Sequence, residues 1–267
     1  MKICSPWLAA TLAAAAAGLA AITPASAGIK TESFEYKDGD TVLEGFIAYD
    51  DATTAKRPGV LVFPSWIGPS AHEQDAAKKL AAIGFVAFVA DPYGKGVRPT
   101  PPKDSGAEMG RYMSNRPMFR TRVKAALDVL AKNPLVDTAK LASIGYCFGG
   151  AAVLELARIG APIVSNVVFH GSLSSPTPAD ARNIKGRVLV LHGADDPAVP
   201  AAEVDAFRKE MKDAKIDMQL VLYPDTVHSY TMPRAGNDNS RGSAYNERSD
   251  KRSWIAMQAF FKETLGM

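Results

Sequence analysis

The sequence predicts a single α/β domain built on a mostly parallel, doubly wound sheet of about eight strands, with helices on both faces. Short runs rich in Val, Ile and Phe alternate with helical patterns from residue 60 onward, which is the order that a parallel sheet requires. These runs show no polar alternation, so both of their faces are expected to be buried. The 267 residues, 47% of them hydrophobic, are enough for one large core.

The chain is expected to open with a hairpin over residues 31–36 and 42–49, because the intervening Asp38-Gly39 step is typical of a tight turn. Six further strands are expected at residues 60–63, 85–90, 141–145, 163–169, 188–191 and 218–222. Helices are expected at residues 72–83, 118–132, 148–158, 201–212 and 245–264. Residues 93–117 and 231–243 lie outside these elements, and long segments at strand ends typically border a ligand crevice.

The composition argues against several classes of protein. Lys and Arg number 31 against 28 Asp and Glu, and a net charge of +3 gives no electrostatic basis for binding nucleic acid. Two cysteines, Cys4 and Cys147, cannot build a disulfide framework or a cysteine-based zinc site. The expected partner is therefore a small molecule, and the sequence leaves the oligomeric state open.

The first 27 residues have the pattern of a secretory signal peptide. A charged start, an alanine-rich apolar run and the small-residue sequence Ala25-Ser26-Ala27 predict cleavage before Gly28. The alternative, an uncleaved membrane anchor, is less consistent with so much alanine and with Gly18 and Pro24. No later run is long enough to span a membrane. We expect residues 28–267 to form one exported domain without stable membrane insertion, in the bacterial periplasm or secreted.

Cys147 occupies the centre of a Gly145-x-Cys147-x-Gly149 sequence that follows an expected strand and opens an expected helix. This is the spacing of a nucleophile elbow, where the central residue turns the chain sharply and its neighbours must be small. The turn places the sulfur at a helix N-terminus, where the dipole favours a thiolate. The alternative is a buried structural cysteine on a glycine-rich turn.

His228 follows the last expected strand, where this architecture places the catalytic base. The acid is expected after the preceding strand, and we choose Asp196 from the D-x-x-V-P pattern, with Asp195 as the reserve candidate. A surface aspartate that caps the next helix is the alternative for Asp196. The other histidines, His72, His170 and His192, are expected to be structural, and no cluster has metal-ligand spacing.

The oxyanion hole of such a fold uses the amide after the nucleophile and one from the loop after an early strand. These positions are Phe148 and Trp66, and Trp66 could equally form a pocket wall. Arg234, Arg111 and Tyr146 are weaker candidates for substrate binding, with Arg116 as another arginine of the same segment. The nearby Arg120 and Arg122 are expected only to coat a solvated helix.

Four motifs resemble the exported branch of the dienelactone hydrolase family of α/β-hydrolases. They are Gly-Tyr-Cys-Phe-Gly-Gly at 145–150, His-Gly-Ala-Asp-Asp-Pro at 192–197, His-Ser-Tyr at 228–230 and Ala-Tyr-Asn-Glu-Arg-Ser-Asp at 244–250. The resemblance implies the α/β-hydrolase fold and a Cys147, Asp196, His228 triad. Ser65 stands where the best-known members carry a glutamate.

The expected function is the hydrolysis of a carboxylic ester or lactone through an acyl-cysteine intermediate, without a metal or organic cofactor. The alternative is an exported protein that keeps the fold and binds a small molecule without turnover. A redox role for Cys147 is disfavoured because no resolving cysteine accompanies it in the mature chain.

Overall fold

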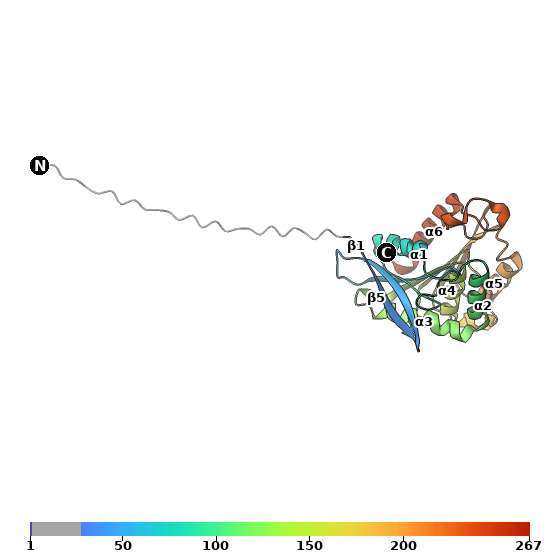
Figure 1. Cartoon of the computed structure of the whole chain (residues 1–267), viewed down its shortest axis with the longest axis horizontal. Helices are drawn as coiled ribbons and strands as arrows, with labels where there is room; N and C mark the ends of the chain where they lie inside the picture. The colour runs from blue at the N-terminus through green and yellow to red at the C-terminus, as the bar shows by residue number, and fades with distance from the viewer. Residues whose placement is uncertain (2–27) are drawn as a thin grey trace.

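One eight-stranded sheet organises the molecule, in the order β1-β2-β4-β3-β5-β6-β7-β8. Figure 1 shows the sheet with helices packed around it. The computed structural model describes residue 1 and residues 28–267, so the expected signal peptide lies almost wholly outside the described residues. β1 pairs with β2, and β2 with β4, in antiparallel fashion, while every later pairing is parallel. The strands are β1 (Ile29–Asp38), β2 (Thr41–Asp50), β3 (Arg57–Phe63), β4 (Val86–Val89), β5 (Val136–Tyr146), β6 (Ser165–Phe169), β7 (Arg187–Gly193) and β8 (Met218–Tyr223).

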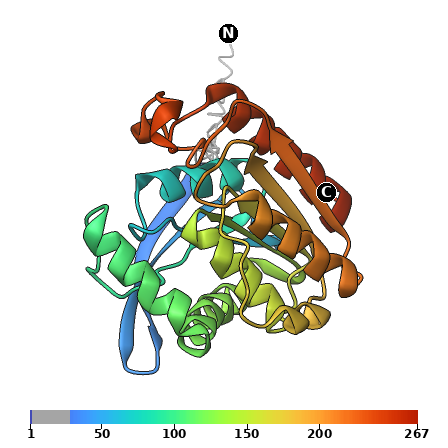
Figure 2. The same ribbon diagram turned by 90° about the vertical axis from the view of Figure 1, so that its right-hand side faces the viewer.

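Helices cover both faces of this sheet (Figure 2). The helices are α1 (Ala71–Ala82), α2 (Lys103–Ser114), α3 (Arg116–Lys132), α4 (Phe148–Arg158), α5 (Ala201–Asp213) and α6 (Glu247–Leu265). α1 and α6 lie on one face, whereas α3, α4 and α5 lie on the other with α2 beside α3. The predicted doubly wound α/β architecture is therefore confirmed.

The alternating direction of side chains along β3 shows how the two core layers arise. Leu61 and Phe63 point into the core beneath α3 and α4, while Val60 and Val62 point into the core beneath α1 and α6. All four side chains are buried. Because both faces need apolar residues, the strand reads as an unbroken hydrophobic run.

The segment 93–117 differs from the sequence prediction, because it contains the helix α2. Gly106 and Gly110 weaken the helical pattern in the sequence, but Tyr112 is buried and its hydroxyl donates to the carbonyl of Tyr93 at 3.1 Å. α3 also begins two residues earlier than expected, since the Asn115 side chain accepts a hydrogen bond from the amide of Met118 and caps the helix.

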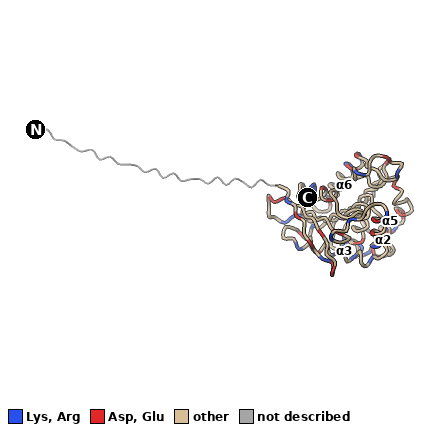
Figure 3. Tube along the Cα trace, viewed as in Figure 1, with Lys and Arg blue, Asp and Glu red and all other residues tan. Residues whose placement is uncertain are grey.

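The carboxyl ends of the parallel strands meet at one edge of the sheet. Phe63 of β3 is in register with Gly145 of β5, and β7 lies beside β8. The loops that follow these four strands therefore converge, and they carry the predicted site residues. Basic and acidic residues alternate along the described backbone without gathering into a region of one sign (Figure 3), and the strands β4, β6 and β8 carry no charged residue.

Candidate active site

Cys147 has the strained backbone conformation of a nucleophile elbow, with φ of 54° and ψ of −114° between β5 and α4. A Cβ atom on Gly145 would lie 2.0 Å from the carbonyl oxygen of Gly149, and one on Gly149 would lie 2.2 Å from the oxygen of Phe63. Only glycine fits at either position, so the spacing in the sequence follows from the sterics of the turn. Cys147 is half-buried and is the one free cysteine in the described part of the chain.

His228 and Asp196 form the polar pair that the sequence predicted, with Nδ1 of the imidazole 2.8 Å from Oδ2 of the carboxylate. The other carboxylate oxygen accepts hydrogen bonds from the amides of Ala198, at 2.8 Å, and Val199, at 3.3 Å. These contacts fix the buried carboxylate so that it faces the imidazole. The reserve candidate, Asp195, is exposed to solvent instead.

The loop that carries His228 is held by main-chain bonds to a distant segment. The His228 amide donates to the carbonyl of Gly242 at 3.2 Å, and the amide of Ala244 donates to the carbonyl of His228 at 3.0 Å. This short parallel bridge places the imidazole without relying on its side-chain contacts alone. It also gives a role to the segment 231–243, which the sequence identified only as a border of the crevice.

The pKa of His228 reflects competing effects. Burial lowers it, but the charge of Cys147 and hydrogen bonds to Asp196 and Cys147 outweigh the burial and raise the pKa to about 10. The protonated imidazole of His228 is therefore favoured at neutral pH.

Two of the remaining histidines, His170 and His192, are buried near this pair. His170 packs edge to face against His228, with ring centroids 5.2 Å apart, and its Nε2 lies 2.8 Å from the Thr231 hydroxyl. Burial lowers the pKa of His170 and of His192, and it lowers that of His72 to about 4. His170 and His192 are buried, whereas His72 is half-buried, packs edge to face on Tyr146 at 4.7 Å and lines a groove beside α1.

Cys147 lines a pocket of about 550 Å³. Its walls combine apolar side chains with a few hydroxyl groups and one arginine. The lining residues are Trp66, Met109, Met113, Cys147, Phe148, Ser172, Pro197, Ala198, Val199, His228, Ser229, Arg241, Gly242 and Ser243. A mainly apolar cavity of this size with a few placed polar groups suits a small organic substrate.

The two residues predicted for the oxyanion hole both line this pocket. Phe148 is the first residue of α4, so its amide is one of the unpaired donors of the helix N-terminus. The loop after β3 crosses directly above the elbow, because a Cβ on Gly149 would touch the carbonyls of Phe63 and Pro64. Trp66 in that loop is anchored by its carbonyl, which accepts the Tyr93 hydroxyl at 3.0 Å.

The weaker substrate-binding candidates lie outside the Cys147 pocket. Tyr146 is buried and stacks on Phe169 at 5.0 Å, because the side chain before the nucleophile points to the opposite face of the sheet. Arg111 is on the exposed side of α2, 3.8 Å from Glu108. Arg234 lines an adjoining groove, where its Nη2 lies 3.5 Å from the Ser65 hydroxyl. Arg241, a residue not predicted from the sequence, lines the pocket itself.

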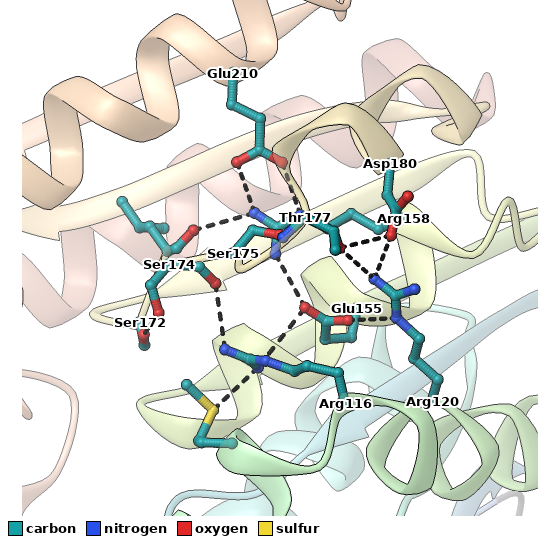
Figure 4. A network of polar contacts seen from close by, with 12 residues as sticks. Arg116, Arg120, Glu155, Arg158, Ser172, Ser174, Ser175, Thr177, Asp180 and Glu210 are labelled. Atoms are coloured by element: carbon teal, nitrogen blue, oxygen red, sulfur yellow. Dashed lines mark hydrogen bonds and ion pairs between the residues drawn. The ribbon is translucent and has the colours of Figure 1, made fainter.

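Three arginines near α2 and α3 turn out to be structural. Arg116 and Arg122 are buried, and Arg120 pairs with Glu155 and Asp180, both at 2.7 Å (Figure 4). The expectation that Arg120 and Arg122 only coat a solvated helix was wrong. Charge alone does not distinguish a solvated arginine from one whose carboxylate partner comes from a distant element.

Glu73 has a buried carboxylate that was not predicted from the sequence. It accepts hydrogen bonds from the Ser65 amide at 3.4 Å, the Ser70 amide at 3.0 Å and the Ser70 hydroxyl at 2.6 Å. These bonds tie α1 to the loop that carries Trp66. The Ser-x-x-Glu capping pattern at residues 70–73 was a signal that could have identified this residue.

The sequence pattern of the Dienelactone hydrolase family matches residues 43–265 of this chain. The chain belongs to the dienelactone hydrolase family. The structure m3DLH is 38% identical, with a TM-score of 0.86, and the match covers 89% of this chain and 99% of that one. The dienelactone hydrolase-like promiscuous phosphotriesterase P91, from metagenomic libraries, is 40% identical with a TM-score of 0.85 and covers 90% and 100%. A Yersinia pestis relative provisionally named carboxymethylenebutenolidase is 26% identical over 234 residues, which cover 83% of this chain and 84% of the relative.

These similarities make the protein an ester or lactone hydrolase of the dienelactone hydrolase family. No helix in the described residues has the length and apolar character needed to cross a membrane. Nor does any group of three or more His, Cys, Asp and Glu side chains within residues 28–267 stand in an arrangement that could hold a metal ion.

Proposed function

We propose that this dienelactone hydrolase family member cleaves its ester or lactone through an acyl enzyme on Cys147. The observation that carries the proposal is the 2.8 Å bond between His228 and Asp196, beside a cysteine on a strained elbow. The thiolate attacks the substrate carbonyl carbon, and the carbonyl π electrons move onto oxygen. The resulting tetrahedral intermediate collapses as the alkoxide leaves and takes a proton from His228.

Deacylation completes the cycle with the same residues in reversed roles. Neutral His228 removes a proton from water, and the hydroxide attacks the acyl carbon. The C–S bond then breaks and releases a carboxylic acid and the thiolate, while His228 keeps the proton. Asp196 orients the imidazole in both halves through its contact with Nδ1.

The amides of Phe148 and Trp66 are proposed to bind the oxyanion in each tetrahedral intermediate. The position of Phe148 at the N-terminus of α4 supports this role, because the unpaired amide and the helix dipole both favour negative charge there. Glu73 supports the second donor indirectly, since its bond to the Ser65 amide fixes the loop immediately before Trp66.

Two arginines are proposed to influence the preference for charged substrates. Arg241 lines the Cys147 pocket, whereas Arg234 lines the adjoining groove, and both cavities share Trp66, Ser229 and Ser243. A carboxylate close to the reacting carbonyl would reach Arg241, and one at the end of a longer chain would reach Arg234. Guanidinium groups bind carboxylates in a bidentate geometry.

A second candidate activity is the hydrolysis of phosphotriesters. It is favoured by the similarity to the promiscuous phosphotriesterase P91, which is 40% identical to this chain in a match that covers 90% of it. A neutral phosphotriester has a P=O oxygen for the same amides and an aryloxide leaving group. Assays with an aryl dialkyl phosphate beside an aryl carboxylate ester measure the two activities on one preparation.

The proposed function is tested by turnover of a p-nitrophenyl ester on the purified protein and on Cys147→Ala. We expect the parent to release nitrophenolate over many turnovers and the variant to fall to the background rate. The competing possibility is a binding protein on the same fold. It would bind the ester but show the same background release in both proteins.

A further inference from the structure

Ser172 is a polar group on the wall of the Cys147 pocket that the proposed mechanism does not use. It belongs to the loop after β6, next to Gly171. A Cβ on Gly171 would lie 2.7 Å from the Cα of Gly150 and 3.1 Å from the carbonyl oxygen of Cys147. This loop therefore packs directly against the nucleophile elbow, and Ser172 lies one residue beyond the contact.

A single carboxylate oxygen holds the loop from the side of α5. Oε1 of Glu203 accepts the amide of Leu173 at 2.6 Å and the amide of Ser174 at 3.0 Å, and it lies 3.1 Å from the Ser172 hydroxyl. Because Oε1 already accepts hydrogen bonds from two backbone amides, it is also the acceptor in its contact with Ser172. The Ser172 hydroxyl must therefore donate its only proton to Glu203.

The remaining contact of Ser172 fixes the direction of a second hydrogen bond. Its hydroxyl oxygen lies 3.2 Å from the hydroxyl oxygen of Ser174. Because the Ser172 proton is already committed to Glu203, Ser174 must be the donor in this contact. A hydroxyl oxygen has two lone pairs, so Ser172 has one acceptor site left and no donor.

Buried arginines hold the carbonyl groups of the same loop (Figure 4). Arg158 donates to the carbonyl of Leu173 at 3.1 Å, and Arg116 donates to the carbonyl of Ser174 at 3.5 Å. Arg158 is itself fixed by a bidentate pair with Glu210, at 2.8 and 2.9 Å. Arg116 also contacts Met113, which lines the pocket from α2.

This arrangement fixes both the position and the hydrogen-bonding polarity of Ser172. The loop amides are held by one anion and the loop carbonyls by two cations, in a network whose members come from α3, α4 and α5. Buried ion pairs of this kind impose a defined geometry, because losing one partner leaves an uncompensated charge. Ser172 therefore combines a place in the pocket wall with a fixed hydroxyl that has one acceptor site left.

We propose that Ser172 is a specificity-determining residue that accepts a hydrogen bond from a hydroxyl group on the acyl part of the substrate. The inference deepens the proposed ester hydrolysis and rests on it, because it assigns the substrate class as hydroxyacyl esters. An ester whose acyl chain has an ether oxygen in the same place offers no donor. Binding of this ether analogue leaves the last acceptor site of Ser172 without a partner, so the parent should cleave it less efficiently than the hydroxyacyl ester.

The test compares p-nitrophenyl esters of butyrate, 2- and 3-hydroxybutyrate, and 2- and 3-methoxybutyrate. The parent is assayed beside Ser172→Ala and Ser175→Ala, the latter a matched control from the same loop that does not line the pocket. For at least one hydroxyl position, we expect the hydroxy-to-methoxy ratio of kcat/KM to fall by about 2- to 10-fold in Ser172→Ala. The ratio should stay at the parent value in Ser175→Ala, and butyrate should be cleaved by all three proteins.

Three results separate the inference from the activity on which it rests. An unchanged ratio in Ser172→Ala at both positions, with butyrate still cleaved, overturns the role of Ser172 and leaves the hydrolase intact. An equal fall in Ser175→Ala assigns the effect to the loop as a whole and likewise overturns it. Failure of the parent to cleave any of the esters removes the proposed function and the inference with it.

Discussion

Nδ1 of His228 lies 2.8 Å from Oδ2 of Asp196, although 32 residues separate the two side chains in the sequence. The relationship follows from the sheet, because Asp196 follows β7, His228 follows β8, and the two strands are parallel neighbours. The contact occupies one imidazole nitrogen and leaves Nε2 for the reaction. Catalysis in the proposed mechanism depends on this division of roles between the two nitrogens.

Replacement of Asp196 by Asn should weaken the enzyme without abolishing it. The asparagine keeps the shape of the side chain but loses the charge that orients the imidazole, so we expect kcat/KM to fall by roughly 10² to 10⁴. His228→Ala should reduce activity to background. Steady-state kinetics on one ester measure both effects. The exposed neighbour, altered as Asp195→Asn, is the control, and a loss there equal to that of Asp196→Asn would contradict the assignment.

The pKa of His228 should depend on Cys147. The charge of Cys147 is the leading cause that raises the pKa to about 10, so Cys147→Ala should lower it. A raised pKa contributes stability fully below the ordinary value of 6.5, and that stability is lost as the pH rises towards 10. In Cys147→Ala this contribution to the free energy of unfolding should therefore be lost at a lower pH than in the parent. Imidazole NMR titration and urea unfolding between about pH 6 and 10 measure the two quantities. Identical His228 titrations in both proteins would show that the cysteine does not influence the base.

Arg241 should contribute more than Arg234 to the hydrolysis of short anionic esters. Removing a guanidinium that binds a carboxylate should cost about 1.5 to 3 kcal/mol in kcat/KM, and the same change should matter little for a neutral ester. The comparison uses monoaryl succinate and aryl butyrate on the parent, Arg241→Ala and Arg234→Ala. A succinate-to-butyrate ratio that is unaffected by Arg241→Ala would mean that Arg241 does not recognise charge.

The nucleophile elbow and the two polar residues of the proposed triad could be predicted from the sequence, because steric limits and positions at strand ends determine them. Gly145 and Gly149 flank Cys147 for steric reasons, and His228 and Asp196 follow strands whose apolar runs are unambiguous. The location of such a residue in the fold follows from its position relative to the end of a strand. A parallel sheet brings those ends together.

The features that the sequence did not reveal depend on contacts between distant elements. Arg241 reaches the pocket because Gly242 packs on Pro197, where a Cβ would lie 2.7 Å from the proline Cγ. Glu203 is an ordinary first-turn glutamate in the sequence, and its three bonds exist only because α5 lies beside the loop after β6. Neither the periodicity nor the residue spacing of the sequence predicts such contacts.

The mature protein is proposed to begin at Gly28 and to occur outside the cytoplasm. The prediction rests on the alanine-rich segment that ends at Ala27, which lies outside the described residues. Expression of the full chain in a bacterial host, fractionation and mass spectrometry of the N-terminal peptide measure it. Peptides from residues 1–27 on the accumulated protein, recovered only from the membrane fraction, would contradict export with cleavage.

The acyl enzyme on Cys147 is the central claim, and intact-protein mass spectrometry after rapid acid quenching tests it most directly. Residues 28–267 are mixed with an excess of an activated aryl ester and quenched during turnover, and Cys147→Ala is treated in parallel. We predict one added acyl group on the parent, located on the Cys147 peptide and lost as the ester is consumed, with no adduct on the variant. Turnover that proceeds at full rate in Cys147→Ala, or an adduct located on a residue other than Cys147, would contradict the account.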